Sequence, residues 1–199
     1  IRCVVGTALG VILTALTAYP LSKKELPFNG VFTNFIMFTM MFSGGMIPSY
    51  LLVKDLHLLN SLWALILPTL LGAYNIFIMR NFFRSIPVSL EEAARMDGAS
   101  WFYIWWKIII PLAKPVLATI TLWILVGHWN SWFDATIYIT DPEKTVMQVV
   151  LRRISIENSA ADMNAIMVRM QKGANAATSK SVEMAMVVIT ILPMLVVYP

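Results

Sequence analysis

Charge is scarce in this sequence, and its scarcity excludes a soluble globular protein. Only 13% of the 199 residues are charged, whereas a typical soluble domain carries about 25%. Hydrophobic residues make up 58% of the chain, and the mean hydropathy is +0.72. A chain of this composition cannot cover its outside with polar groups. Lipid is therefore expected to be its main solvent.

Cysteine and histidine are also rare, which argues against metal and redox sites. The chain has one cysteine, Cys3, and two histidines. One cysteine cannot form an intramolecular disulfide or a cysteine-based metal cluster, and two histidines cannot form a histidine-rich site. The phosphate-binding pattern G-x-x-x-x-G-K-[ST] does not occur. No cofactor, no metal and no ATP hydrolysis are expected in this chain.

The modest basic excess does not indicate nucleic acid. The formal net charge is +4 and the sequence pI is about 9.3. Basic residues commonly flank membrane helices and lie at lipid headgroups. No basic run with interleaved aromatic residues occurs at an exposed site, so no nucleic-acid partner is expected.

Long uncharged segments are what the chain has instead. A helix needs about 20 apolar residues to cross a hydrocarbon core of about 30 Å. A spanning segment is expected to be helical, because an open strand would leave backbone groups unpaired in lipid. Four segments meet or approach this length, and a fifth is cut off by the chain end: 3–22, 28–53, 56–79, 115–133 and 184–199. The sequence predicts an all-α, polytopic transmembrane helical bundle over residues 1–199, interpreted as a fragment that lacks material at both ends.

The connections between these segments differ in character. The second segment is interrupted by Gly44, Gly45 and Pro48, which predicts either a kink or a re-entrant stretch. Residues 81–107 are too charged to cross a membrane, and residues 134–180 form a long excursion with two helical patterns, at 146–154 and 163–170. Basic residues lie on both sides of the bundle, so charge alone leaves the orientation open.

The polar segment 81–107 has the features of a helical hairpin. Ser89 and Glu92 fit a capping box, with Pro87 just upstream, and Glu91 stands four residues before Arg95, the favourable order for an ion pair. Gly98 suits a left-handed helix end after Asp97. The side formed by Leu90, Ala93, Ala94 and Asp97 is mostly small, so a partner could approach closely. Such a hairpin suits the transmission of motion from a docked protein.

The same residues resemble the EAA signature of ABC importer permeases. The resemblance lies in Glu92, Ala93 and Ala94, in Gly98, and in the run from Ile108 to Leu112 after nine intervening residues. Ile110 departs mildly from the pattern, which usually has leucine there. The flanks at 81–87 and 111–115, and the stretches 129–132 and 141–143, are similar to the maltose-type carbohydrate branch. Residues 147–153 are similar, more weakly, to permeases for aldouronates and related polysaccharide fragments.

This resemblance implies a fold, a function and partners. It implies a type I importer permease with about five of six helices present, in a bacterial cell membrane. Residues 81–107 would be the cytoplasmic coupling hairpin on an ATP-binding subunit, and residues 134–180 an extracytoplasmic loop that meets a sugar-binding protein. A second, different permease would complete the membrane part. The ATPase-coupling role falls on Glu92, Ala93, Ala94, Asp97 and Gly98.

The substrate path is predicted more loosely. Polar groups at membrane depth often mark a pathway, and Asn34, Tyr74, Asn75 and Asn130 are of this kind, although hydrogen bonds between helices explain such groups more often. Trp129 suits either sugar stacking or an interfacial aromatic belt. The alternative function is an ion-driven secondary transporter, which would require intramembrane acids. The four full apolar segments contain no Asp or Glu, and no nucleophile–base pair or paired ligands suggest an intramembrane enzyme.

Overall fold

The computed structural model describes residues 1–153, 156, 184–185, 187–192 and 195. They fall into two compact units, which are treated separately below. Unit 1 contains residues 1–58 and 62–128, and unit 2 contains residues 59–61 and 129–199. Every regular element in the described ranges is helical, as the composition predicts. The helical pattern expected at 163–170 lies outside the described residues.

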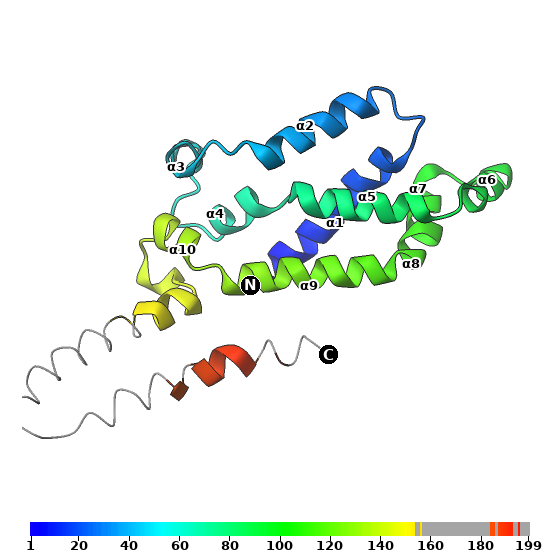
Figure 1. The fold of residues 1–199 in the computed structure, drawn as a ribbon. Helices are drawn as coiled ribbons and strands as arrows, with labels where there is room; N and C mark the ends of the chain where they lie inside the picture. The colour runs from blue at the N-terminus through cyan, green and yellow to red at the C-terminus, as the bar shows by residue number, and fades with distance from the viewer. Residues whose placement is uncertain (154–155, 157–183, 186, 193–194, 196–199) are drawn as a thin grey trace, which may run out of the picture. The chain divides into compact units, whose positions relative to one another are not determined.

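Unit 1 is built around α1 (Arg2–Ser22), which packs along α5 (Ala73–Ser85). In Figure 1, α1 runs obliquely from the level of α9 (Lys114–Asn130) to beyond α5. One apolar core joins the three helices, because each contributes buried apolar side chains to it. Its members are Ala15, Ala18, Tyr19 and Leu21 of α1, Ile76, Met79 and Phe83 of α5, Val116 and Ile120 of α9, and Ile104, Trp105, Ile109 and Ala113 of the segment before α9.

Glycines let α1 lie close to its neighbours. A Cβ atom at Gly6 would lie 2.6 Å from Nε2 of the buried His128, and one at Gly10 would lie 3.3 Å from the carbonyl oxygen of Leu70. Any side chain at Gly6 would therefore require the His128 ring, or the helix that bears it, to shift. Close backbone approach through small residues is the usual packing mode of membrane helices.

The apolar segments form one continuous span and three bent ones. In the described ranges α1 alone is long and apolar enough to cross a membrane, and up to four spans result if each bent pair counts as one. This agrees with the four full segments expected from the sequence. The pairs are α2 (Asn29–Met41) with α3 (Met46–Asp55) at 112°, α4 (Trp63–Ile66) and η1 (Leu67–Thr69) with α5 at 51°, and the run Trp101–Leu112 with α9 at 81°.

The bends occur at glycine and proline. The expected break in the second segment is confirmed: α3 begins after Gly45, whose φ of +86° is left-handed. The run before α9 consists of α7 (Trp101–Ile104), the π-helical turn η2 (Trp105–Ile109) and α8 (Ile110–Leu112). Pro111 lacks the N–H that an α-helix would use at this point, and a wider turn is a common response.

Unit 2 is organised around Asn60. Its side-chain oxygen accepts hydrogen bonds from the backbone N–H of Thr140 (2.6 Å) and of Asp141 (3.2 Å). The backbone N–H of Asn60 donates to the carbonyl of Tyr138 (2.9 Å). These bonds tie residues 59–61 to α10 (Phe133–Tyr138) and η3 (Pro142–Lys144). Residues 147–153 are helical, which agrees with the first pattern expected in the excursion.

Candidate functional site

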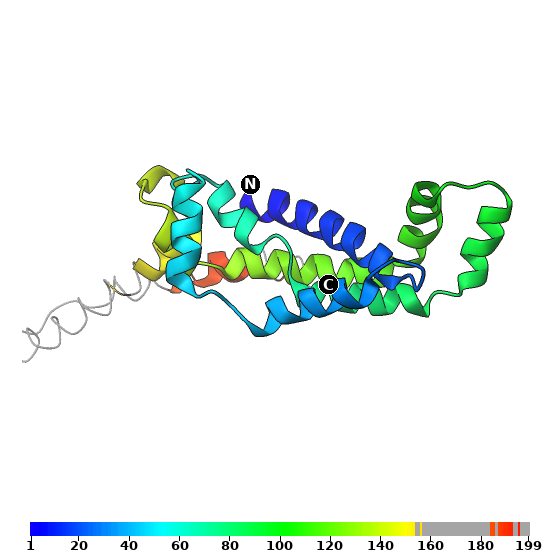
Figure 2. The same ribbon diagram turned by 90° about the horizontal axis from the view of Figure 1, so that it is seen from above.

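A short exposed helix, α6 (Val88–Met96), forms the hairpin expected from the sequence. Figures 1 and 2 both show α6 projecting beyond the ends of α1 and α5. The helix begins at Val88 with Pro87 as its N-cap, so Ser89 lies inside the first turn and the predicted capping box is wrong. Proline is preorganised for a helix start by its fixed φ, and it sets this start two residues earlier.

Gly98 ends α6 with a left-handed turn, as predicted. Its φ is +80°. Its N–H donates to the carbonyl of Arg95 (3.0 Å), and the N–H of Ala99 donates to the carbonyl of Ala94 (3.0 Å). These two bonds form a Schellman motif, which satisfies carbonyls that the helix end would otherwise leave without partners. Ser100 then caps α7 by accepting from the N–H of Tyr103 (3.3 Å). The elbow is thus hydrogen-bonded on both sides.

The outward face of α6 is open and contains most of the predicted coupling residues. Glu92, Ala93, Asp97 and Gly98 are exposed, and Met96 on the same side is 88% exposed. Ala94 is the exception, because it is half-buried and packs against the core of unit 1. A hollow of about 780 Å³ adjoins the elbow and is lined by Ala94, Asp97, Gly98, Ala99, Ser100, Tyr103, Lys107 and Ile108.

Glu91 attaches α6 to the end of α1. It is 5% exposed. Its carboxylate forms an ion pair with Lys23 and accepts a hydrogen bond of 3.3 Å from the Tyr19 hydroxyl. The predicted pair of Glu91 with Arg95 is therefore wrong. The Arg95 guanidinium lies over the Trp101 ring instead, 4.4 Å from its centroid.

The last carbonyls of α1 are held by side chains from two other helices. Arg80 of α5 donates from Nε to the Leu21 carbonyl (2.8 Å), and Asn29 of α2 donates to the carbonyls of Leu21 (3.2 Å) and Lys23 (2.6 Å). Arg80 also donates to Oδ1 of Asn29 (3.3 Å). Cations and amide donors are favourable here, because a helix C-terminus carries partial negative charge and unpaired carbonyls.

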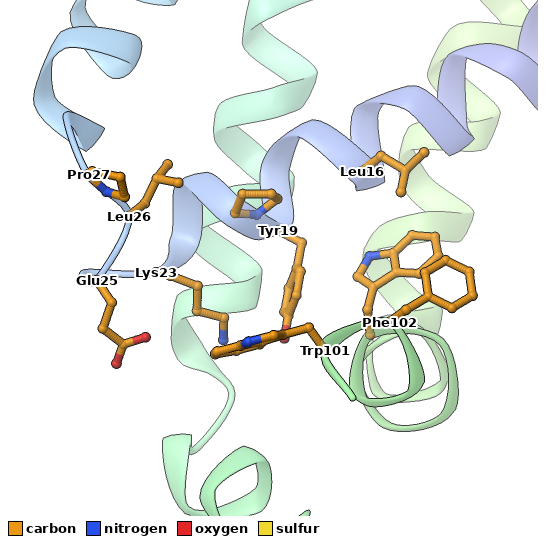
Figure 3. A pocket seen from close by; sticks show the side chains of 10 residues that line it. Leu16, Tyr19, Lys23, Glu25, Leu26, Pro27, Trp101 and Phe102 are labelled. Atoms are coloured by element: carbon orange, nitrogen blue, oxygen red, sulfur yellow. The ribbon is translucent and has the colours of Figure 1, made fainter. Parts of the chain in front are cut away.

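An apolar hollow of about 430 Å³ lies beside this helix end. In Figure 3 the side chains of Tyr19, Lys23 and Trp101 converge at its edge, with Phe102 and Leu16 on the opposite side. The Lys23 ammonium lies 4.6 Å from the centroid of the Tyr19 ring. The junction of α1 with the hairpin is therefore aromatic on one side and ionic on the other.

The residues proposed for a substrate path are only partly brought together. Tyr74 and Asn75 lie in the first turn of α5, and Tyr74 stacks on Trp123 of α9 with ring centroids 6.0 Å apart. Asn34 lies exposed on α2. Trp129 and Asn130 belong to unit 2 and lie at the end of α9. In the described ranges no group of three or more His, Cys, Asp or Glu side chains could hold a metal ion.

Sequence reasoning missed Tyr19, Lys23, Asn29 and Arg80. Their distance along the chain from α6 hides them, since Lys23 and Tyr19 lie 68 and 72 residues before Glu91. One signal was available. Lys23, Arg80 and Arg84 all fall on the side of the bundle that also has the hairpin, so opposite charges there could be expected to meet.

Comparison with known proteins gives one consistent family. Residues 6–198 match the family described as binding-protein-dependent transport system inner membrane component. The polygalacturonan/rhamnogalacturonan transport system permease protein YtcP of Bacillus subtilis is 44% identical over 196 residues, with 98% of this chain and 68% of that protein covered. Protein LplC of the same organism is 43% identical over 197 residues, with 98% and 65% covered. The chain thus spans about two thirds of the length of these relatives.

A solved structure shows the same fold. A bacterial ABC transporter involved in the import of the acidic polysaccharide alginate matches with a TM-score of 0.84 and 39% sequence identity, covering 100% of this chain and 71% of that chain.

Proposed function

Because the chain belongs to the family of inner membrane components of binding-protein-dependent transport systems, we propose that it is the permease subunit of an ATP-driven ABC importer for carbohydrates. Proteins of this family transport solutes across the membrane and are not known as enzymes. ATP hydrolysis is assigned to a separate ATP-binding subunit. A second permease and an extracytoplasmic sugar-binding protein complete the importer in a bacterial cell membrane.

The observation that carries this proposal is the exposed, hydrogen-bonded elbow at Gly98. Residues 81–107 are the cytoplasmic coupling hairpin, and Glu92, Ala93, Asp97 and Gly98 offer the ATP-binding subunit a small, open surface. Ala94 supports this surface from its inner side. When the ATP-binding subunits close, they push the hairpin, and the helices joined to it switch between outward- and inward-open states, as in other rigid-body transitions. The loop 134–180, much of which lies outside the described residues, is assigned to the opposite side of the membrane, where it would meet the binding protein.

The substrate class proposed is an acidic oligosaccharide. One relative is named for polygalacturonan and rhamnogalacturonan, and the matching structure for the acidic polysaccharide alginate. Tyr74, stacked on Trp123, presents an aromatic surface of the kind that suits a sugar ring. Asn34, Asn75, Trp129 and Asn130 are proposed as further members of the path.

Uptake is expected to need ATP and to prefer a uronate chain. The complete importer in proteoliposomes, with its binding protein outside, should accumulate a galacturonate oligosaccharide only when ATP is supplied to the ATP-binding subunit. Uptake should survive an ionophore that collapses ion gradients. A neutral glucose oligosaccharide of the same length is the matched control and should enter more slowly. Accumulation driven by an ion gradient without ATP would contradict the proposal and favour a secondary transporter.

A cysteine at Met96 is expected to crosslink to the ATP-binding subunit. Met96 is 88% exposed on the outward face of α6, and Cys3 can be replaced by alanine to give a cysteine-free background. Met96→Cys should react with a short bifunctional reagent when the assembled importer is treated. Lys144→Cys, exposed in the proposed extracytoplasmic loop, is the control. It should react from outside intact cells and should not join the ATP-binding subunit. The reverse pattern would reject the proposed orientation.

A further inference from the structure

One buried charged group attaches the hairpin to the rest of unit 1, in addition to the packing of Ala94 against the core. Among the described residues of α6, the buried one is Glu91, at 5% exposed. Its partners lie at the C-terminal end of α1, Tyr19 in its last turn and Lys23 as its C-cap, and not on the neighbouring helices of the hairpin. A buried carboxylate is stable only when it is paired and hydrogen-bonded. The attachment of α6 to α1 is therefore specific, because movement of either helix alone would leave a charge without its partner.

The cluster of Tyr19, Lys23 and Glu91 is compact and mostly buried, although Tyr19 and Lys23 also border the apolar hollow. The Lys23 and Glu91 side chains are 18% and 7% exposed. Tyr19 donates to Glu91, lies beneath the Lys23 ammonium, and meets Phe83 of α5 edge-on, with ring centroids 6.0 Å apart. Figure 3 shows Tyr19 and Lys23 coming from the end of α1 toward Trp101 of α7. The cluster thus lies where α1, α5 and the hairpin meet.

The helix on the other side of this cluster is suited to carry a displacement. α1 has 21 residues and is the span in the described ranges that does not depend on a bent pair of helices. Its other end packs through Gly6 on the buried His128 with almost no free space. Closely packed interfaces switch between discrete arrangements and do not deform gradually. A shift of the Lys23 end of α1 would therefore also displace the packing contact at the Gly6 end.

We propose that the cluster of Tyr19, Lys23 and Glu91 is the joint through which the hairpin moves α1, which makes Lys23 and Glu91 positioning residues for energy coupling. This inference rests on the proposed function, because it assumes that an ATP-binding subunit pushes the exposed face of α6. The inference adds to the proposed function the route by which that push is transmitted inside this chain. Force applied at the elbow reaches the bundle through an ion pair on α1, in addition to the covalent connections into α5 and α7.

Charge reversal tests the joint. In the complete importer, Lys23→Glu and Glu91→Lys should each lower the number of sugar molecules imported per ATP hydrolysed by about tenfold, since each places like charges together in a poorly solvated site. The double variant with both changes should recover to within about twofold of the original ratio, because the ion pair reforms with its ends exchanged. If the ion pair were purely structural, the single variants would lower the amount of protein in the membrane and would leave the ratio of sugar imported to ATP hydrolysed unchanged.

Two further variants distinguish loss of coupling from a general effect of charge or of folding. Lys24→Glu makes the same change at the adjacent, exposed lysine and should leave the ratio unchanged. If a reversed variant does not accumulate, Glu91→Gln provides the test. It removes the charge at nearly constant size and should lower the ratio about threefold. The inference is overturned if the single variants keep the original ratio, or if the double variant is as poor as the singles. Failure of Met96→Cys to crosslink in the chain that keeps Lys23 and Glu91 would instead reject the proposed function.

Discussion

Replacing Gly98 with leucine is expected to lower sugar uptake by at least about tenfold while leaving the protein in the membrane. Gly98 has φ of +80°, and a residue with a side chain pays about 1–2 kcal/mol in this conformation. A difference of about 1.4 kcal/mol is tenfold in an equilibrium. Crowding is not the cause, since a Cβ here would meet nothing within 4 Å. The strained elbow would open, and the leucine would also stand in the proposed docking surface.

Two controls separate backbone strain from size. Gly98→Asn should retain most of the uptake, because asparagine tolerates the left-handed conformation better than other side chains. Gly30→Leu makes the same substitution in α2, at a glycine with ordinary backbone geometry and open space around its Cβ position, and should have little effect. Uptake, ATP hydrolysis and the amount of membrane-inserted protein are measured together. Normal uptake by Gly98→Leu would reject the role assigned to the elbow.

The elbow could be predicted from the sequence because its causes are local. Pro87, Asp97 and Gly98 act within one or two turns of their own positions, and glycine has a strong preference for the left-handed helix end. The predicted helix and its end agree with α6 and with the φ of Gly98. The predicted capping box was wrong, although it too depended only on neighbouring residues. Pro87 and Ser89 both favour a helix start, and sequence alone does not say which prevails.

The attachment of the hairpin could not be predicted from local sequence. Spacing on one helix favoured Arg95 as the partner of Glu91, but an exposed pair of this kind contributes only about 0.3–0.5 kcal/mol. Lys23 and Tyr19 offer Glu91 a less solvated site and two partners. Which distant residue arrives there depends on how α1 packs on α5. That packing depends on side chains from four or more segments together.

The membrane spans also have some features that follow from local sequence and others that depend on packing between distant segments. Their number follows from apolar length, which the bilayer thickness fixes. Their bends were only partly foreseen: Gly45 and the prolines marked weak points, but the angles of 112°, 51° and 81° depend on what packs on each side. The stacking of Tyr74 on Trp123 likewise joins residues of α5 and α9 that no sequence pattern connects.

Replacing Arg80 with methionine is expected to destabilise the protein clearly while leaving the hairpin and its ion pair unchanged. Arg80 is 9% exposed and donates to Leu21 (2.8 Å) and Asn29 (3.3 Å). A hydrogen bond from a charged group contributes about 1.5–3 kcal/mol, so the free energy of unfolding should fall by about 2–3 kcal/mol. For a chain of this size this corresponds to a melting temperature lower by about 5–10 °C. Thermal unfolding of the purified protein in detergent would measure the change.

Arg84 provides the matched control, because it performs a similar task one turn further along α5 without burial. It is exposed and donates to the Ser22 carbonyl over 3.4 Å, so Arg84→Gln should change the free energy of unfolding by less than about 0.5 kcal/mol. Arg80→Lys should fall between the two. It keeps the charge at the end of α1 but loses the fork that reaches Leu21 and Asn29 together. If Arg80→Lys were as stable as the original chain, charge at the helix end would suffice. If Arg80→Met were as stable, the side chains of Asn29 and Arg84 would hold the end of α1 without it.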